Sequence, residues 1–206
     1  MTYGEFKTFV MQLIDQYSAR GVTLTGEYND QADFFARIPG IYNAVMLELA
    51  SGPSPLVAVM EPQAADVTER QGFMIVSTPQ DFLKMSEDGL PVGERGRMTR
   101  VKDYWMLGTD RVMIRKELFR DAVLEYWRTP TRLEAAPADS VGLDGTVEMQ
   151  TAAAYYVAAL LVIREDPFLY AALRNEYDDR VQSMKKRRRA ENFFVTDPYL
   201  VDAGPW

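Results

Sequence analysis

Carboxylates and cations are the side chains with which this sequence would have to do chemistry, because its 206 residues include no histidine and no cysteine. Their absence removes the usual zinc ligands, the thiol nucleophile and the most common proton-transfer group near neutral pH. Carboxylates alone can still support glycoside hydrolysis or magnesium-dependent phosphoryl transfer. The adjacent pairs Glu87-Asp88 and Asp178-Asp179 have no acid–base spacing, however, and are typical of solvated surface. We therefore predict that the protein is not an enzyme and binds no cofactor or metal.

A run of five cations is the strongest charge feature: Lys185, Lys186, Arg187, Arg188 and Arg189. The net charge of the chain is −7, and removing the +5 of this run leaves −12, so an acidic body carries one basic patch. Three interpretations stay open. The run is a solvated helix end that complements the helix dipole, a contact for phosphate groups, or a docking site for an acidic partner or neighbouring subunit. The acidic remainder argues against a dedicated DNA-binding protein, whose basic face is usually broader.

The C-terminal residues 190–206 predict an extended arm, because Pro198, Gly204 and Pro205 prevent a regular helix over the whole segment. Its large apolar side chains are candidate anchors for a partner: Phe193, Phe194, Tyr199, Leu200 and Trp206. Exposed in water they would be a liability, so they pack either on their own domain or on a partner. We favour a partner surface.

The elements that must position these groups begin with two helices. Thr2 and Glu5 have the spacing of a capping box and open a helix that ends before Gly21. Asn29 or Asp30 caps a second helix that stops at 51–53, and Pro39 predicts a kink or break within it.

Two more helices are expected near the C-terminus. Residues 147–164 are apolar nearly all round, which indicates a buried helix. Asp166 and Pro167 open the next helix, and its inward stripe comprises Leu169, Leu173, Tyr177, Val181 and Met184.

Between the helices, residues 56–133 contain short strand-like runs separated by turn formers, with the best hairpin at 104–115. We therefore predict an α+β fold, mainly a helical bundle with a small antiparallel β lobe inserted between helices 2 and 3. The expected domains are a helical core (1–55 and 134–189), the inserted lobe (56–133) and the arm (190–206).

No apolar run approaches the roughly 20 residues that a membrane-spanning helix needs, since the longest is 152–163. The first 15 residues mix charges with apolar residues and do not resemble a signal peptide. We expect a soluble protein, and the lack of cysteine fits a reducing compartment.

The order of several segments resembles the head–tail adaptor (connector) proteins of tailed bacteriophages and prophages, in their longer version of about 200 residues. The resemblance covers nearly the whole chain through loose core patterns. These are the 13–18 stretch LIDQYS, Asn29-Asp30, the 126–130 stretch YWRTP, the 155–161 stretch YYVAALL, and Glu165-Asp166-Pro167. The basic run and the aromatic arm have no counterpart in this pattern.

The resemblance implies a virion structural protein, located in the neck between head and tail and assembled in the host cytoplasm. Such adaptors form a ring, generally a dodecamer, beneath the portal protein. The ring extends the channel through which DNA passes without specific recognition during genome ejection, and the tail or neck protein docks on it.

Within that framework, our own inference is that the arm docks on the portal or an adjacent subunit. The β lobe would face the next neck component through Trp105, Arg111 and Arg115. The alternative is a nucleic-acid-binding accessory protein that uses the basic run 185–189, and a carboxylate hydrolase is a distant third.

Overall fold

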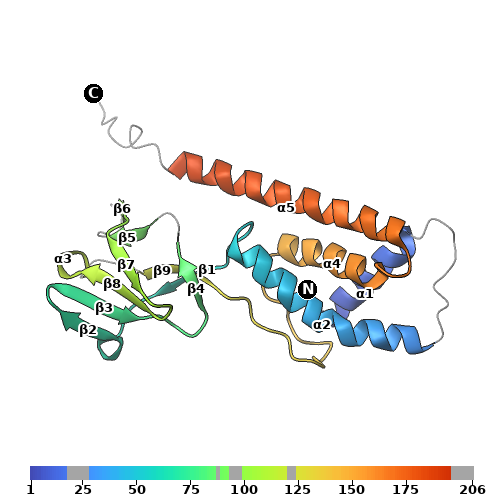
Figure 1. The fold of residues 1–206 in the computed structure, drawn as a ribbon, viewed down its shortest axis with the longest axis horizontal. Coiled ribbons are helices and arrows are strands. Elements are labelled where there is room, and N and C mark those ends of the chain that lie inside the picture. Colours follow the sequence, from blue (N-terminus) through green and yellow to red (C-terminus); the bar gives the residue numbers. More distant parts are fainter. Residues whose placement is uncertain (18–27, 87–88, 93–98, 120–123, 196–206) are drawn as a thin grey trace. The chain divides into compact units, whose positions relative to one another are not determined.

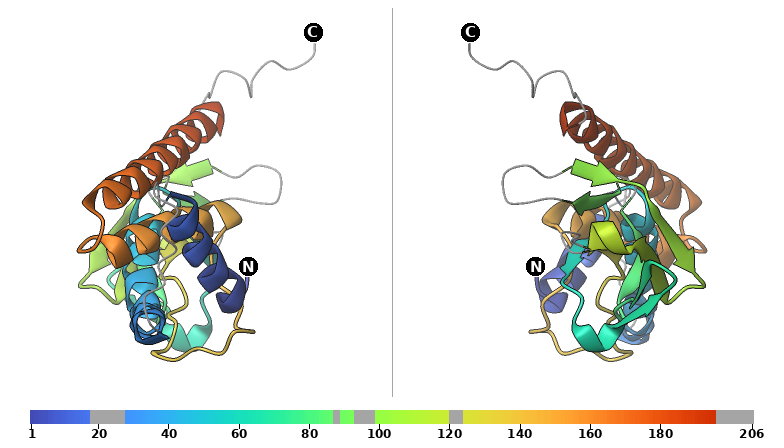
Figure 2. Two further views of the ribbon diagram at one scale, coloured as in Figure 1. Left: turned by 90° about the vertical axis from the view of Figure 1, so that its right-hand side faces the viewer. Right: turned by 90° about the vertical axis from the view of Figure 1, so that its left-hand side faces the viewer.

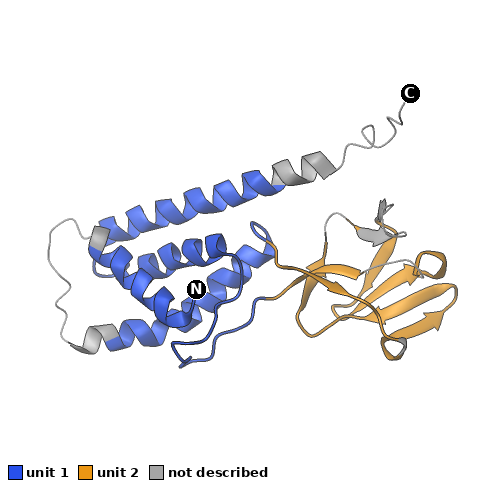
Figure 3. Ribbon diagram, turned by 180° about the vertical axis from the view of Figure 1, so that it is seen from behind, with its two compact units in different colours: residues 1–54, 130–206 blue, residues 55–129 orange. Residues whose placement is uncertain are grey.

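A computed structural model describes residues 1–17, 28–86, 89–92, 99–119 and 124–195 (Figure 1). The chain divides into two compact units, coloured separately in Figure 3. Residues 1–54 and 130–206 form the helical unit, and residues 55–129 form the β unit. The helical unit contains α1 (Tyr3–Tyr17), α2 (Tyr28–Ser51), α4 (Val147–Val162) and α5 (Pro167–Val195).

Helix α4 is the centre of the helical unit. It contacts α1, α2 and α5, and α5 lies alongside it (Figure 2). Eleven of its residues are buried, including five alanines whose small side chains let the neighbouring helices approach closely. The expectation of a helix buried on most of its surface is confirmed.

Helices α1 and α5 begin where the capping residues predict, whereas α2 begins at Tyr28, before the expected caps Asn29 and Asp30. The Thr2 amide donates to Glu5 Oε2 at 2.8 Å and the Glu5 amide donates to Thr2 Oγ1 at 3.3 Å, which completes a capping box for α1. Asp166 Oδ1 accepts from the Phe168 and Leu169 amides at 3.0 and 2.9 Å, with Pro167 as the first residue of α5. The predicted inward stripe of α5 is buried throughout.

Helix α2 continues through Pro39, so the predicted break does not occur there. A proline inside a helix costs about 3 kcal/mol through the lost hydrogen bond and the steric clash. The residues on either side offset this cost, because Ile38, Tyr42 and Val45 are all buried to within 1% of full burial. Tertiary packing therefore overrides the local signal.

Gln150 on α4 ties the preceding loop to the helix core. Its Nε2 donates to the carbonyl oxygens of Leu143, Asp144 and Gly145 at 3.0, 3.3 and 3.1 Å, and its Oε1 accepts from the amino group of Met1 at 2.8 Å. The side chain is only 3% exposed, so these groups have little access to water as an alternative partner.

The β unit contains a four-stranded and a three-stranded antiparallel sheet. The first has the order β2 (Val67–Arg70), β3 (Phe73–Ser77), β8 (Arg111–Arg115), β7 (Tyr104–Leu107). The second has the order β1 (Val57–Met60), β9 (Leu124–Arg128), β4 (Phe82–Met85). A third pair joins β5 (Leu90–Val92) to β6 (Thr99–Val101), and two short helices complete the described part, the 3-10 helix η1 (Ala64–Asp66) and α3 (Lys116–Phe119).

A separate core joins the two larger sheets. Val76, Val112 and Ile114 from the four-stranded sheet pack with Met85 and Leu124 from the three-stranded sheet. The β7–β8 hairpin has Leu107 opposite Arg111, with Gly108 at φ +70° in its turn, and confirms the hairpin predicted at 104–115.

The predicted fold class is wrong in its proportions. The molecule is a mixed α/β structure with two substantial sheets, not a mainly helical bundle with a small β lobe. The sequence pattern misses four strands, β2, β4, β5 and β6. They are three or four residues long and contain charged residues or a proline, so they show too little alternation to be recognised alone.

The predicted extended arm is also wrong at its start. Helix α5 runs through the basic run and ends at Val195, so residues 190–195 are helical. Alanine and glutamate at 190 and 191 are good helix formers, and the helix-breaking Pro198 comes only later. Residues 196–206 lie outside the described part of the chain.

The contacts of Gln150 generate the first prediction. Gln150→Leu leaves the Leu143 and Gly145 carbonyl groups without this donor, whereas the Asp144 carbonyl keeps the Tyr42 hydroxyl, and should lower the free energy of unfolding by about 2 kcal/mol. Urea unfolding followed by circular dichroism measures this loss. Gln182→Leu, at an exposed position on α5, is the matched control and should change stability by less than about 0.5 kcal/mol. Equal effects of both substitutions would contradict the role assigned to Gln150.

The burial of Tyr177 generates a pH prediction. Burial first, and then the nearby Glu48 carboxylate that accepts from its hydroxyl at 3.3 Å, raise the pKa of Tyr177. The unfolded chain then loses this proton near pH 10 while the folded chain keeps it, so stability is constant below pH 10 and falls above it. Tyr177→Phe should reduce this fall by about 1 kcal/mol at pH 11. Denaturant titrations at pH 8 and 11 test it, and an unchanged alkaline fall would contradict it.

Candidate interaction surfaces

Among the described residues, no group of three or more histidine, cysteine, aspartate or glutamate residues gathers to hold a metal ion. An open hollow of about 580 Å³ lies between α2 and residues 132–135. Three polar side chains line it, Asn43, Arg132 and Glu134, and Asn43 donates to the Leu133 carbonyl at 2.9 Å and accepts from the Leu133 amide at 2.8 Å. These two hydrogen bonds hold α2 against the 132–135 segment, so Asn43 has a structural role at this hollow.

Within the described residues, no helix is both long enough and apolar enough to cross a bilayer.

The basic run lies inside α5 and not at its end. Arg187 forms an ion pair with both carboxylate oxygens of Glu148, in the first turn of α4. Arg188 Nη1 donates to the Gly52 carbonyl oxygen at 2.6 Å, just after α2. Lys185 and Lys186 are exposed, and the side chain of Arg189 is not described. Two of the five cations therefore hold α5 against the rest of the helical unit.

The predicted arm anchors fall largely outside the described structure. Phe193 and Phe194 belong to the last turn of α5, but their side chains are not described. Tyr199, Leu200 and Trp206 lie outside the described residues altogether. Their role as anchors stays a prediction.

The β-lobe candidates share one face of the four-stranded sheet. Arg111 and Arg115 occupy alternate positions of β8, and Trp105 of β7 lies opposite Met113, which stands between them. Val112 and Ile114 point to the opposite face and into the core. We call the face that carries Trp105 the outer sheet face.

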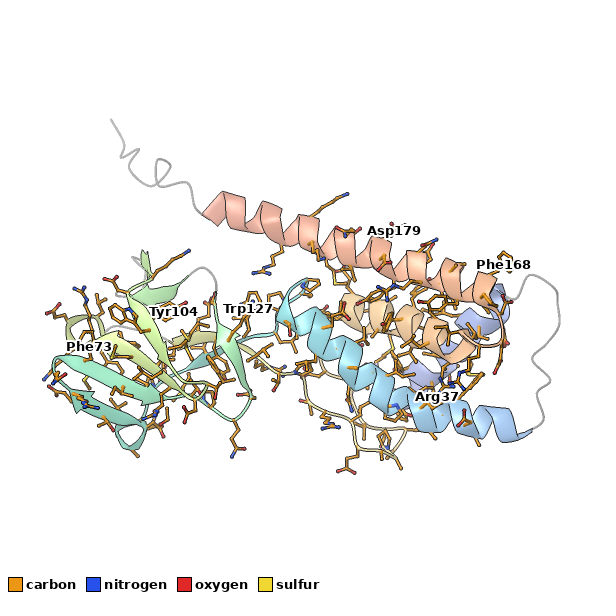
Figure 4. The ribbon with its side chains drawn as sticks, viewed as in Figure 1. Arg37, Phe73, Tyr104, Trp127, Phe168 and Asp179 are labelled. Atoms are coloured by element: carbon orange, nitrogen blue, oxygen red, sulfur yellow. The ribbon has the colours of Figure 1, made fainter. Side chains whose placement is uncertain are left out.

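The outer sheet face has an apolar centre. By register it comprises Phe73 and Ile75 of β3, Met113 of β8, and Trp105 and Leu107 of β7. Phe73 and Trp105 meet edge to face with ring centroids 5.6 Å apart, and Trp105 is 43% exposed. Figure 4 labels Phe73 on this sheet. A surface with this many large apolar side chains is typical of an interaction site.

Arginines border this apolar centre. The two-residue turn Gln71-Gly72, with φ of 50° and 82°, brings Arg70 opposite Phe73, and Arg115 lies opposite Phe73 on the other side. Sequence reasoning missed Arg70, because β2 was not recognised as a strand.

Sequence reasoning also missed Phe168, an exposed apolar residue on α5. It is 89% exposed and lies one position before Leu169, the first residue of the buried stripe. The helical period could have predicted this exposure, since Phe168 falls outside the inward stripe of α5. The edge strand β1 also exposes Val57 and Val59, at 54% and 59%.

The sequence was compared with protein-family models and with curated proteins. No family model and no curated protein matches it.

The contact of Arg188 generates the third prediction. Arg188→Ala removes a charged hydrogen bond that joins α5 to the end of α2 and should lower the free energy of unfolding by about 1–2 kcal/mol. Lys186→Ala is the matched control, because this neighbouring cation is exposed on the same helix. Chemical denaturation of both variants measures the difference. If the two midpoints agree, the basic run has no structural role at Arg188.

Proposed function

We propose that this protein is a structural head-to-tail adaptor of a tailed bacteriophage. Copies form a ring under the portal protein, extend the DNA channel and present the surface on which the tail or neck docks. The observation that carries the proposal is the exposure of large apolar side chains on both compact units, Phe168 on one and Trp105 on the other. The sequence resemblance to such adaptors is the reason for proposing this particular assembly, a ring between portal and tail.

The exposed residues support a protein with several partners. A side chain of this size is exposed at a cost, and patches on separate units indicate separate contact sites. A ring needs two different and complementary faces on each subunit, and further faces for the portal and the tail. A chain with two separate cores can present such faces on both units.

The charge distribution supports a conduit for DNA. The helical unit has 12 lysine and arginine residues against 18 aspartate and glutamate residues, a net charge of −6. The β unit has 11 against 12, a net charge of −1. An acidic wall repels the phosphate backbone, so DNA slides along it and does not bind.

The alternative, a nucleic-acid-binding accessory protein, has weaker support. Its basic run would have to neutralise phosphates, but Arg187 and Arg188 already bond to Glu148 and Gly52. Among the described side chains of the run this leaves Lys185 and Lys186 as exposed cations without a partner role in the fold, a small footprint on an acidic body.

Electron microscopy of the purified protein, with and without rings of the portal protein from the same genome, tests the proposal. We expect added ring-shaped density at one end of the portal only when both proteins are present. A monomer in the absence of the portal is compatible with an adaptor whose ring forms on that template. If no density is added to the portal at saturating protein concentration, the proposal is wrong.

A truncation after Val195 gives the fourth prediction. It keeps the whole of α5 and removes Tyr199, Leu200 and Trp206, so the protein should fold with an unchanged circular dichroism spectrum. If the arm supplies aromatic anchors, each worth on the order of 2 kcal/mol, the truncated protein should bind portal rings at least about tenfold more weakly. Unchanged binding, with unchanged yield of infectious particles in a complementation assay, would exclude the arm as an anchor.

A further inference from the structure

The outer sheet face carries two arginines with unused charge. Arg70 and Arg115 are exposed, and neither forms a hydrogen bond or an ion pair with any residue in the described part of the chain. Both lie opposite Phe73 in the strand register, one on each of the two neighbouring strands. The third cation, Arg111, has Asp110 at 3.7 Å. An apolar centre with free cations at its border is suited to an apolar protrusion bordered by carboxylates.

The side of α5 that faces away from α4 offers such a protrusion. Phe168 and Asp179 are eleven residues apart, close to three helical turns, so they share one side of the helix (Figure 4). Asn175 lies between them on the same side and is exposed. We call this surface, residues 168–179, the helix outer face.

Free carboxylates lie at both ends of the helix outer face. Glu165 in the turn before α5 and Asp179 are exposed, and their carboxylates have no cationic partner among the described residues. Arg164 adds one exposed cation at the same turn. The helical unit as a whole nevertheless has a net charge of −6, against −1 for the β unit.

We propose that the outer sheet face of one copy binds the helix outer face of a second copy. The occupant is a second copy because this chain itself contains the complementary surface: Phe168 for the apolar centre, and carboxylates for Arg70 and Arg115. The contact joins two different faces, so each copy uses both, which is the kind of contact that a ring of identical subunits requires. The ring rests on the proposed function, whereas the contact between two copies can be tested without it.

The spacing of the two surfaces agrees. Along β8, Arg115 and Arg111 are four residues apart, or about 13 Å. Along α5, Phe168 and Asp179 are about 16 Å apart. Phe168 placed on Phe73 therefore brings Asp179 toward Arg111 and leaves Glu165 near Arg70 and Arg115.

Disulfide trapping between two variants tests the contact, and the chain has no cysteine of its own to interfere. Ser77→Cys lies on the outer sheet face, opposite Arg111. Asn175→Cys lies on the helix outer face. Because the two cysteines are on separate copies, only a contact between copies forms the link. We expect the mixture to give at least ten times more cross-linked dimer than a mixture of Ser77→Cys with the control Ser140→Cys.

Ser140 is a matched control because it is an exposed position outside α5, in the segment that precedes α4. Equal yields with Asn175→Cys and Ser140→Cys would overturn the proposal.

Charge reversal makes the test specific. Arg70→Glu with Arg115→Glu, added to Ser77→Cys, should reduce the link at least tenfold. Glu165→Arg with Asp179→Arg, added to Asn175→Cys, should restore it with the reversed sheet face. An unchanged yield after reversal of the sheet face alone would also overturn the contact.

The same variants separate this inference from the proposed function. If the link forms but the protein adds no density to portal rings, the contact stands and the adaptor role fails. If Arg70→Glu with Arg115→Glu still joins heads to tails with full infectivity, the adaptor role stands and the contact fails. Cross-linking of Ser77→Cys to a neck protein in place of the second copy would also overturn it.

Discussion

The burial of α4 over most of its surface is the constraint on which the helical unit depends. A helix surrounded by α1, α2 and α5 leaves no polar side for water, so its residues must be apolar and small enough for three neighbours. Gln150 is the one polar side chain among the buried residues of α4, and its hydrogen bonds to three carbonyl groups make it possible to bury. Because α5 packs its apolar stripe against α4, the opposite side of α5 faces solvent, and Phe168 on that side is exposed.

The chain passes into the β unit after α2 and returns to the helical unit before α4, yet each unit has its own core. Val76, Val112 and Leu124 belong to a cluster that lies wholly within the β unit. The returning segment is joined to α2 by the paired hydrogen bonds between Asn43 and Leu133. A unit inserted in this way folds around its own apolar residues, so its outer surface can be adapted to a partner without change to the helical core.

The cations divide by role in a way that their sequence spacing does not suggest. The adjacent cations of the basic run include Arg187 and Arg188, which stabilise α5 within its own unit. Arg70 and Arg115 are 45 positions apart in sequence, yet they flank one phenylalanine. A row of charges in a sequence is therefore weaker evidence for a binding surface than charges that a sheet brings together.

The sequence by itself determined the four long helices, because capping residues and the 3.6-residue period are local signals. The capping box at Thr2 and Glu5 and the Asp166 cap are both present. It also determined the 104–115 hairpin, through two short runs and a glycine turn. Tertiary structure decided the rest. Packing carried α2 through Pro39, and cross-strand pairing made strands of segments such as 67–70 that have no periodicity of their own. The outer sheet face therefore could not be predicted in full, since strand register, a non-local property, places Arg70 beside Phe73.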